Sequence, residues 1–352
     1  MRYWEPAVIE GGAPGEGSLD ARLMRASRIS VPLQRRSMSG PECMPPLSVV
    51  CLGLGPFGTS VSRDDAFILL DTFFGLGGSF VDTANVYAEW EPGGAGASER
   101  TLGAWMRSRG VRGDIVIGTK GGHPRLETMR LSRLSPADIA HDVDESRERL
   151  GTETIDLYWL HRDDPAIPID EIMSAVYTHI DSGAVHMLGA SNWSVERLEE
   201  ARVWARMHDR AGFCASQIAW SLAHNNTAYD PDAGTRAMDR ATMAYHRMSG
   251  MPVIPYSAQA SGLFARPYDE TNGRYGAYHN AITAARYAAA QRVAVERGVT
   301  PNAIALAYLL NHPCCAAAIA GAHTVEQIKD SCSAAGIILT DAEMRSLEAE
   351  TE

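Results

Sequence analysis

The stretch DIVIGTKGGHPRLETMRLSRLSPADIAHDVDESRERLGTETIDLYWLH (114–161) decides the fold, because it predicts one complete strand–helix–strand unit. Two short apolar runs, 114–120 and 155–161, are typical of buried strands. Between them, residues 136–150 have the spacing of an amphipathic helix, with Pro136 suited to the first turn after Ser135. Two buried strands joined by a helix indicate a parallel pair, because parallel strands need a long crossover connection.

The same unit recurs on both sides of this stretch, from Leu47 to near the C-terminus. The expected strands are 48–55, 79–84, 114–120, 155–161, 185–191, 214–220, 252–257 and 315–321. The expected helices are 64–76, 98–109, 136–150, 170–182, 195–211, 231–248, 281–297, 301–310 and 325–335. Eight strand-then-helix units in a chain of 352 residues favour an α/β fold of the closed (β/α)₈ TIM-barrel type.

A doubly wound open sheet is the competing fold. Its dinucleotide-binding turn has the pattern G-x-G-x-x-G after the first strand, and Gly53, Gly55 and Gly58 match that pattern. The match is weak, because the following segment 59–65 is polar and no acidic residue closes a second strand where a ribose would need it. Asp82 does end the expected second strand, but the residues after it indicate chemistry of another kind.

Residues 1–45 are rich in glycine, proline and arginine and show no clear period. We expect an N-terminal extension over 1–45 that ends in a short hairpin, followed by the barrel over 46–352 with a C-terminal helix and loop. The extension is equally suited to covering the barrel, to an oligomer contact or to disorder.

Composition excludes several classes of protein. The formal net charge is −11, which argues against nucleic-acid binding, and no apolar run approaches the roughly 20 residues that span a bilayer. The six cysteines form no C-x-x-C pair, so we expect reduced thiols in a cytoplasmic protein and no metal site.

Four chemically active side chains are expected at neighbouring strand ends. Asp82 ends the second strand, and Tyr87 follows five residues on. Lys120 ends the third strand and His161 ends the fourth. Because the carboxyl ends of barrel strands converge on one mouth, these side chains are predicted to meet.

This grouping suits acid catalysis at a carbonyl. A free phenol, with a pKa of about 10, is a poor acid at neutral pH, and a neighbouring lysine cation lowers that pKa. A carboxylate then fixes the lysine, and a histidine orients a substrate carbonyl or shares its proton. Lys120 and Lys329 are the only lysines among the 32 lysine and arginine residues, which suggests that Lys120 has a task arginine cannot perform. The sequence offers no metal and no activated serine or cysteine, so hydride is expected from a bound cofactor.

These residues lie within segments that resemble the aldo-keto reductase family, from about Leu47 to the C-terminus. The matching segments are FVDTANVY (80–87), SERTLG (98–103), IVIGTK (115–120), IDLYWLHRDDP (155–165), GASNWS (189–194), SQIAWSL (216–222), PYSAQASGLF (255–264) and GAHTVEQIKDS (321–331). The resemblance implies a nicotinamide-dependent carbonyl reductase. By this resemblance Tyr87 is the general acid, Lys120 lowers its pKa, Asp82 holds Lys120, and His161 orients the carbonyl.

The resemblance also implies where a nicotinamide cofactor binds. Ser191, Asn192 and Gln217 resemble the group that bonds the carboxamide, and Trp220 stands where the family usually has a tyrosine stacked on the nicotinamide ring. The other expected contacts lie after the first strand, in the pyrophosphate loop and at the adenine and 2′-phosphate site: Gly55, Phe57, Tyr256, Ser257, Gln259, Gly262, Leu263, Gly321, His323, Thr324, Gln327 and Ser331.

One departure bears on cofactor choice. The family often has arginine or lysine where this chain has His323 and Gln327, and a 2′-phosphate prefers a permanent cation. Thr324 and His323 can still donate hydrogen bonds, so NADP is favoured and NAD stays open.

The substrate is a small carbonyl compound. Trp90, Trp193 and the loops 121–135 and 257–278 are expected to line the mouth. The aromatic faces together with Asp163 would suit a sugar- or cyclitol-like ring. The alternative is a purely structural role, in which Asp163 caps a loop and Trp193 packs in the core.

The leading hypothesis is therefore NADPH-dependent reduction of an aldehyde or ketone. An NAD-linked sugar or alcohol dehydrogenase is the alternative in the same chemistry. A cofactor-binding regulatory subunit of another protein is the alternative from a different class, favoured by the extension and disfavoured by the intact group of four. The sequence does not set the oligomeric state.

Overall fold

The computed structural model describes residues 34–36, 46–226 and 234–348. The strands are β1 (Arg35–Arg36), β2 (Leu47–Ser48), β3 (Val50–Gly53), β4 (Phe80–Asp82), β5 (Val116–Gly121), β6 (Ile155–Leu160), β7 (Val185–Ser191), β8 (Phe213–Gln217) and β9 (Ala318–Gly321). The α-helices are α2 (Arg63–Gly75), α3 (Ala97–Arg109), α4 (Pro136–Leu150), α5 (Ile169–Asp181), α6 (Val195–Met207), α7 (Arg240–Ser249), α8 (Ala281–Arg297), α9 (Pro301–Leu310), α10 (Val325–Ser333) and α11 (Asp341–Glu348). Short 3₁₀ segments include η4 (Ala260–Ala265) and η5 (Gly273–Tyr278).

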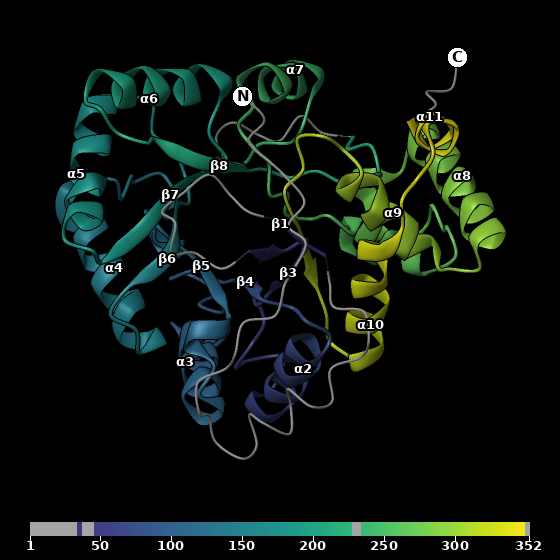
Figure 1. The fold of residues 1–352 in the computed structure, drawn as a ribbon, viewed down its shortest axis with the longest axis horizontal. Coiled ribbons are helices and arrows are strands. Elements are labelled where there is room, and N and C mark those ends of the chain that lie inside the picture. The colour runs from purple at the N-terminus through teal and green to yellow at the C-terminus, as the bar shows by residue number, and fades with distance from the viewer. Residues whose placement is uncertain (1–33, 37–45, 227–233, 349–352) are drawn as a thin grey trace.

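The strands form a parallel sheet in the order β8-β7-β6-β5-β4-β3-β9, so the first and last strands of the barrel are neighbours. The pairing follows chain order, and Figure 1 shows the helices outside the strands. Asp82 of β4 lies opposite Gly118 of β5, which brings the ends of these two strands to the same level.

Residues 252–256 close the barrel between β8 and β9. The Ser216 amide donates to the Pro252 carbonyl (2.9 Å) and the Ala316 amide donates to the Val253 carbonyl (2.8 Å). This segment was expected as the seventh strand, but it makes only isolated bridges, because Pro252 and Pro255 have no N–H to donate to a ladder. With it, the (β/α)₈ barrel predicted from the sequence is confirmed.

The core has an inner and an outer layer. Alternate strand side chains, among them Phe80, Trp159 and Ile254, pack in a cluster inside the barrel. Their neighbours along each strand, such as Tyr158 and Leu160, pack in separate clusters against the helices. This division follows from the two-residue period of a strand, and it decides which residues near a strand end face the mouth.

Local signals set most helix bounds. Ser135 caps α4 by accepting from the Asp138 amide, with Pro136 in the first turn, and Gly151 ends the helix in a left-handed conformation. α4, α8 and α9 have the predicted bounds. α6 ends at Met207, four residues before the expected Ala211, and α7 begins at Arg240 rather than at residue 231.

Of the predicted hairpin before the barrel, the structure describes the antiparallel pair β1–β2, in which Arg36 lies opposite Leu47. The rest of the expected extension, residues 1–33 and 37–45, lies outside the described residues. In the part of the chain that the structure describes, no helix is long and apolar enough to cross a membrane.

Candidate active site

Lys120 lies at the centre of the predicted group of four. Its ammonium group donates to the Asp82 carboxylate, to the Thr83 carbonyl (2.8 Å) and to the Tyr87 hydroxyl (2.9 Å). All three donors are therefore used, and Lys120 and Asp82 are each 1% exposed. The Gln217 side-chain amide donates to the second Asp82 oxygen (3.0 Å) and fixes the carboxylate from β8. The structure thus brings together the ammonium, carboxylate and phenol predicted from the sequence.

Burial and charge compete at this group. Burial lowers the pKa of Lys120, but the Asp82 carboxylate beside it leaves the pKa above its ordinary value, so the ammonium form is held. Burial raises the pKa of Tyr87, and the Lys120 cation acts against that rise without reversing it. Lys120 thus lowers the pKa of Tyr87 as predicted, but burial outweighs this effect, so the phenol keeps its proton at neutral pH.

His161 completes the group at the end of β6. Its ring centroid lies 6.0 Å from that of Tyr87 and 4.7 Å from that of His123. Burial is the main cause that holds the pKa of His161 well below its usual range, and His123, Lys120 and Arg162 act in the same direction. The pKa of His123 falls to about 4, mainly through burial. Both imidazoles are therefore neutral at pH 7.

The surroundings of His161 indicate which nitrogen carries its proton. Nδ1 is buried and has no hydrogen-bond partner among the described residues. A buried N–H without an acceptor is rare, so the proton is better placed on Nε2. A neutral His161 in this form can donate a hydrogen bond from Nε2.

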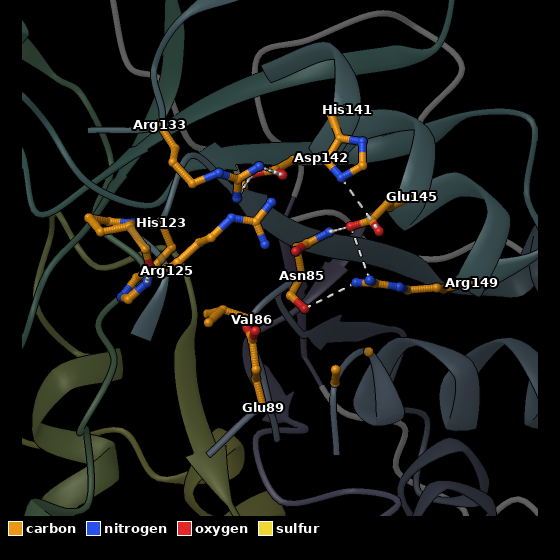
Figure 2. Close-up of a pocket in the computed structure, with 14 residues that line it drawn as sticks. Asn85, Val86, Glu89, His123, Arg125, Arg133, His141, Asp142, Glu145 and Arg149 are labelled. Carbon is orange, nitrogen blue, oxygen red and sulfur yellow. Dashed lines mark hydrogen bonds and ion pairs between the residues drawn. The ribbon is translucent and has the colours of Figure 1, made fainter. Parts of the chain in front are cut away.

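The loop that carries Tyr87 is tied to α4. The Asn85 side chain donates to Glu145 (3.1 Å), and Arg149 donates to the Asn85 carbonyl (3.2 Å) and pairs with Glu145 (3.0 Å). Arg149 also reaches Glu99, which is 0% exposed (3.4 Å). Figure 2 shows Asn85 pointing toward Glu145 and Arg149. The sequence did not point to Asn85, Glu145 or Arg149, because contacts between a loop and a distant helix leave no local sequence pattern.

We call the contacts of Arg149 with Asn85, Glu145 and Glu99 the Arg149 clamp. A polar pocket of about 230 Å³ lies beside this clamp. Val86, next to Tyr87 in the chain, and His123, next to His161 in space, are among its lining residues. Figure 2 shows the side chains around it, which come from the loops after β4 and β5 and from α4. His141, Asp142 and Glu145 have nitrogen or oxygen atoms within 4.8 Å of one another, a spacing that could hold a metal ion. Asp142 already accepts from the Gly122 amide (2.9 Å) and from Arg133 (3.1 Å), so its carboxylate forms the pocket wall.

Of the residues expected at the nicotinamide, Ser191, Asn192 and Gln217 lie together at the neighbouring ends of β7 and β8. Asn192 has a left-handed backbone (φ 65°) at the end of β7, and its amide donates to the His161 carbonyl (3.2 Å) and to the Ser191 hydroxyl (3.1 Å). Its side-chain oxygen accepts from the Tyr256 hydroxyl (2.8 Å). These contacts link the ends of β6 and β7 to the segment 252–256, which lies on the other side of β8.

The expected pyrophosphate loop has a backbone suited to an anion. Ser257, Ala260, Ser261 and Gly262 all have positive φ, between 46° and 85°, and successive amides in such turns can point toward one ligand. A methyl group added at Gly55, Gly262 or Gly321 would meet no atom within 4 Å, so the backbone is open to close approach at these positions. The left-handed turns and the open glycine positions are the features by which the described residues fit a dinucleotide. Leu263 is buried in the outer core, and Phe57 is 0% exposed, so either would contact a ligand through its backbone.

Gln259 joins this loop to the expected adenine side. Its oxygen accepts from the Gly321 amide (3.0 Å), and its nitrogen donates to Ser331 (3.1 Å) on α10. Thr324 caps α10 by accepting from the Gln327 amide (3.3 Å), and the Gln327 side chain accepts from the His323 amide (2.7 Å). A helix N-terminus with these polar groups suits an anion.

Three aromatic or acidic residues are not where the sequence analysis expected them. Trp220 belongs to the outer core and packs edge-on to His312 (4.9 Å), because it has the opposite strand parity to Ala215 and Gln217, which face inward. Tyr256 is the aromatic side chain that lies against the inner cluster there.

Trp193 is 1% exposed and packs against Phe213 (5.0 Å), and Asp163 is paired with Arg197 (3.1 Å). The packing and loop-cap alternative therefore describes both residues, and neither lines an open mouth. Trp90, by contrast, is 54% exposed and lies edge-on to Tyr87 (6.1 Å), as expected for a residue at the mouth.

Known proteins share this sequence pattern. The family model described as the aldo/keto reductase family matches residues 49–352. Norsolorinic acid reductase B of Aspergillus parasiticus is 31% identical over 339 residues, which cover 90% of this chain and 84% of that protein. Aryl-alcohol dehydrogenase GME11368 of Pestalotiopsis microspora is 26% identical over 332 residues (90% of this chain, 82% of that protein). The uncharacterized oxidoreductase YrpG of Bacillus subtilis is 29% identical over 314 residues (86% and 91%).

Proposed function

Because this chain belongs to the aldo/keto reductase family, we propose that it reduces an aromatic aldehyde or ketone to the alcohol with NADPH as the cofactor. The chain is an oxidoreductase of that family, and carbonyl reduction is the chemistry the family shares. The observation that carries the proposal is the Tyr87 hydroxyl held 2.9 Å from the Lys120 ammonium, beside a neutral His161.

Each of the four residues has a step to perform. His161 donates a hydrogen bond from Nε2 to the carbonyl oxygen and so polarises the carbonyl. Tyr87 gives its proton to that oxygen as the alkoxide forms. Lys120 stabilises the phenolate left behind, and Asp82 keeps Lys120 charged and in place. When bound, NADPH supplies the hydride.

Several described residues would hold the cofactor. Ser191, Asn192 and Gln217, at the ends of β7 and β8, would bond the carboxamide, and the ring of Tyr256, rather than that of Trp220, would stack on the nicotinamide. The left-handed Ser261–Gly262 turn and the N-terminus of α10 would take the phosphates. Water is kept from the reacting centre by burial of Asp82 and Lys120.

The proposed substrate class differs from the sugar-like ring suggested by the sequence. Asp163 and Trp193, on which that suggestion depended, are occupied by Arg197 and by the core. Trp90 remains as an exposed aromatic face 6.1 Å from Tyr87, which suits a flat ring. Two of the three relatives reported above are named for norsolorinic acid and for an aryl alcohol. These points together favour an aromatic carbonyl compound.

The reverse reaction, oxidation of an aryl alcohol with NAD, is the second candidate. It is favoured by the first turn of α10, which carries Glu326 and no basic residue, since a carboxylate there disfavours a 2′-phosphate. The same four residues would act in the opposite order.

Calorimetric titration of the purified protein with NADPH and with NADH, followed by turnover of 4-nitrobenzaldehyde and 4-nitrobenzyl alcohol, tests these candidates. We expect tighter binding of NADPH and reduction of the aldehyde. Selective NADH binding with alcohol oxidation would move the assignment to the dehydrogenase. If neither cofactor bound, the proposal would be wrong and a regulatory role would come forward.

A further inference from the structure

Arg162 follows His161 directly, and none of the residues that the structure describes serves as its counter-ion. Burial lowers the pKa of its guanidinium, and the hydroxyls of Tyr256 and Tyr87 are the groups that act in the opposite direction. Within the described ranges, no carboxylate pairs with Arg162 and its guanidinium makes no hydrogen bond. A half-buried arginine without an anion is costly, because buried charges are ordinarily paired.

The neighbouring carboxylates are committed elsewhere. Asp163 accepts three hydrogen bonds at 3.1 to 3.2 Å from the Arg197 guanidinium, which also reaches the Ile167 carbonyl. Asp164 accepts from the Ala166 amide (3.0 Å) and so shapes the turn after β6. The two acidic residues next in the chain therefore leave Arg162 free.

Other observations locate the Arg162 side chain near His161, His123 and Gly234. Its backbone carbonyl accepts from the Trp193 indole (3.3 Å), which fixes the residue after His161. Its aliphatic stem passes Gly234 so closely that a methyl group there would come within 3.0 Å of Cδ. Its charge also lowers the pKa values of His161 and His123, so the guanidinium acts electrostatically on both imidazoles.

The local chemistry defines a ligand. His161 and His123 are neutral, Tyr87 is protonated, and the Lys120 charge is matched by Asp82. Among the described residues, the positive charge of Arg162 is therefore the one beside these groups that no carboxylate matches. Trp90 offers an aromatic face on the Tyr87 side. A guanidinium binds a carboxylate through paired N–H donors.

We propose that Arg162 is a specificity-determining residue that binds an anionic oxygen group, such as a carboxylate, on the aromatic carbonyl substrate. This inference rests on the proposed reductase function and adds the acidic substituent to the substrate class. It assigns Arg162 a role in substrate recognition that is separate from proton transfer by Tyr87.

The test compares charged and neutral substrates of one shape. The 2-, 3- and 4-formylbenzoates and their methyl esters are offered with NADPH to the full chain, to Arg162→Met and to Arg162→Lys. Arg236→Met is the matched control, since Arg236 is an exposed arginine near Asp163 and its loss removes the same charge.

We expect the unmodified protein to prefer at least one formylbenzoate to its ester in kcat/KM. Arg162→Met should lower that preference by about 10- to 100-fold, mainly through KM, because one charge-assisted pair is lost. Arg162→Lys should restore part of the preference, and Arg236→Met should keep it within about twofold. Benzoate inhibition of ester reduction should weaken in Arg162→Met by a similar factor, which gives a second measurement from the same variant.

Two results would overturn the proposal in different ways. If the unmodified protein reduces both classes and Arg162→Met leaves their ratio and the benzoate inhibition unchanged, the role of Arg162 is wrong while the reductase function stands. If the unmodified protein reduces neither class although it binds NADPH, the proposed function fails, and this inference fails with it. Circular dichroism of each variant shows that loss of preference is not loss of fold.

Discussion

Lys120 shows at the residue scale why the chain keeps a lysine here. Its ammonium has three donors, and Asp82, the Thr83 carbonyl and the Tyr87 hydroxyl each accept one. The site is closed, with Lys120 1% exposed, so there is no room for the larger, planar guanidinium. Lys120 is one of only two lysines in the chain, which suggested a task that arginine cannot perform. Its three hydrogen bonds explain why a lysine is needed at this position.

Tyr87→Phe tests the proton donor. We expect kcat to fall by about 100- to 10,000-fold, because only the transferable proton is removed, and NADPH affinity to stay nearly unchanged. Steady-state reduction of an aromatic aldehyde and a fluorescence titration measure the two. Tyr158→Phe is the matched control, since its buried hydroxyl has no hydrogen-bond partner in the described part of the chain. Retention of most turnover by Tyr87→Phe would contradict the acid assignment.

Lys120→Arg tests the lysine. We expect turnover to fall about 100-fold or more, because arginine cannot place a compact charge between Asp82 and Tyr87. Lys329→Arg, at an exposed position on α10, should keep its rate and serves as the control. Rates like those of the unmodified protein in Lys120→Arg would show that any cation suffices.

At the element scale, the loop after β4 depends on α4 for its position. Arg149 holds the Asn85 carbonyl and two carboxylates, and Thr119, next to Lys120, donates to the buried Glu99 (2.6 Å). The clamp thus connects Thr119, next to Lys120, with Asn85, two residues before Tyr87. Arg149 is a positioning residue, because it touches the loop and not the reacting atoms.

Arg149→Met should therefore lower both stability and rate. We expect a loss of about 3–5 kcal/mol in the free energy of unfolding, since Glu99 is left buried without its cation. The value of kcat should fall about 10- to 100-fold through displacement of the Tyr87 loop. Urea unfolding and steady-state kinetics measure the two effects.

The double variant Arg149→Met with Glu99→Gln separates these effects, because it should recover much of the stability and little of the rate. Arg202→Met removes an exposed pair with Glu199 and should cost under about 1 kcal/mol. A rate in Arg149→Met equal to that of the unmodified protein would show that the clamp does not position Tyr87.

The other element-scale differences have local physical causes. The segment 252–256 lacks a regular ladder because of its two prolines, yet it still bridges β8 and β9. Helix periodicity predicted the length of α4, where Ser135 and Gly151 mark both ends, but it overran α6, whose cap at His208 is not a glycine. Caps that are visible in the sequence made bounds predictable.

At the scale of the whole molecule, burial of neutral histidines makes stability depend on pH. His246 on α7 is 0% exposed, and it contacts the Met251 carbonyl through Nδ1 (2.9 Å), just before the segment that closes the barrel. Burial lowers its pKa from 6.5 to about 4. The unfolded chain therefore binds more protons than the folded chain between these values.

The stabilisation from neutral His246 is complete above about pH 6.5 and is lost as the pH falls toward about 4. The loss amounts to about 3 kcal/mol for this group. We expect His246→Asn, which keeps a donor for the Met251 carbonyl, to show a smaller fall in Tm between pH 7 and pH 4.5 than the unmodified protein. His141→Asn, on the exposed side of α4, is the control. An equal fall in both variants would contradict the assignment.

The sequence by itself determined the barrel and the four residues at its mouth. Strand and helix periods are local, so alternating units indicated the fold, and the strand ends at Asp82, Lys120 and His161 indicated the mouth. The family match over residues 49–352 agrees with the resemblance seen in the same motifs. The cofactor contacts expected from that resemblance stay predictions, with open glycine positions and a left-handed loop in their favour.

Only the tertiary structure decided which nearby residues face the mouth and which are used elsewhere. Trp220 and Trp193 face outward into the core, Asp163 is taken by Arg197, and Tyr256 and Arg162 are left at the mouth. The physical reason is that a side chain past a strand end takes its direction from strand parity and from partners on distant helices. Those partners come together only when the barrel closes, and composition and spacing along the chain do not encode them.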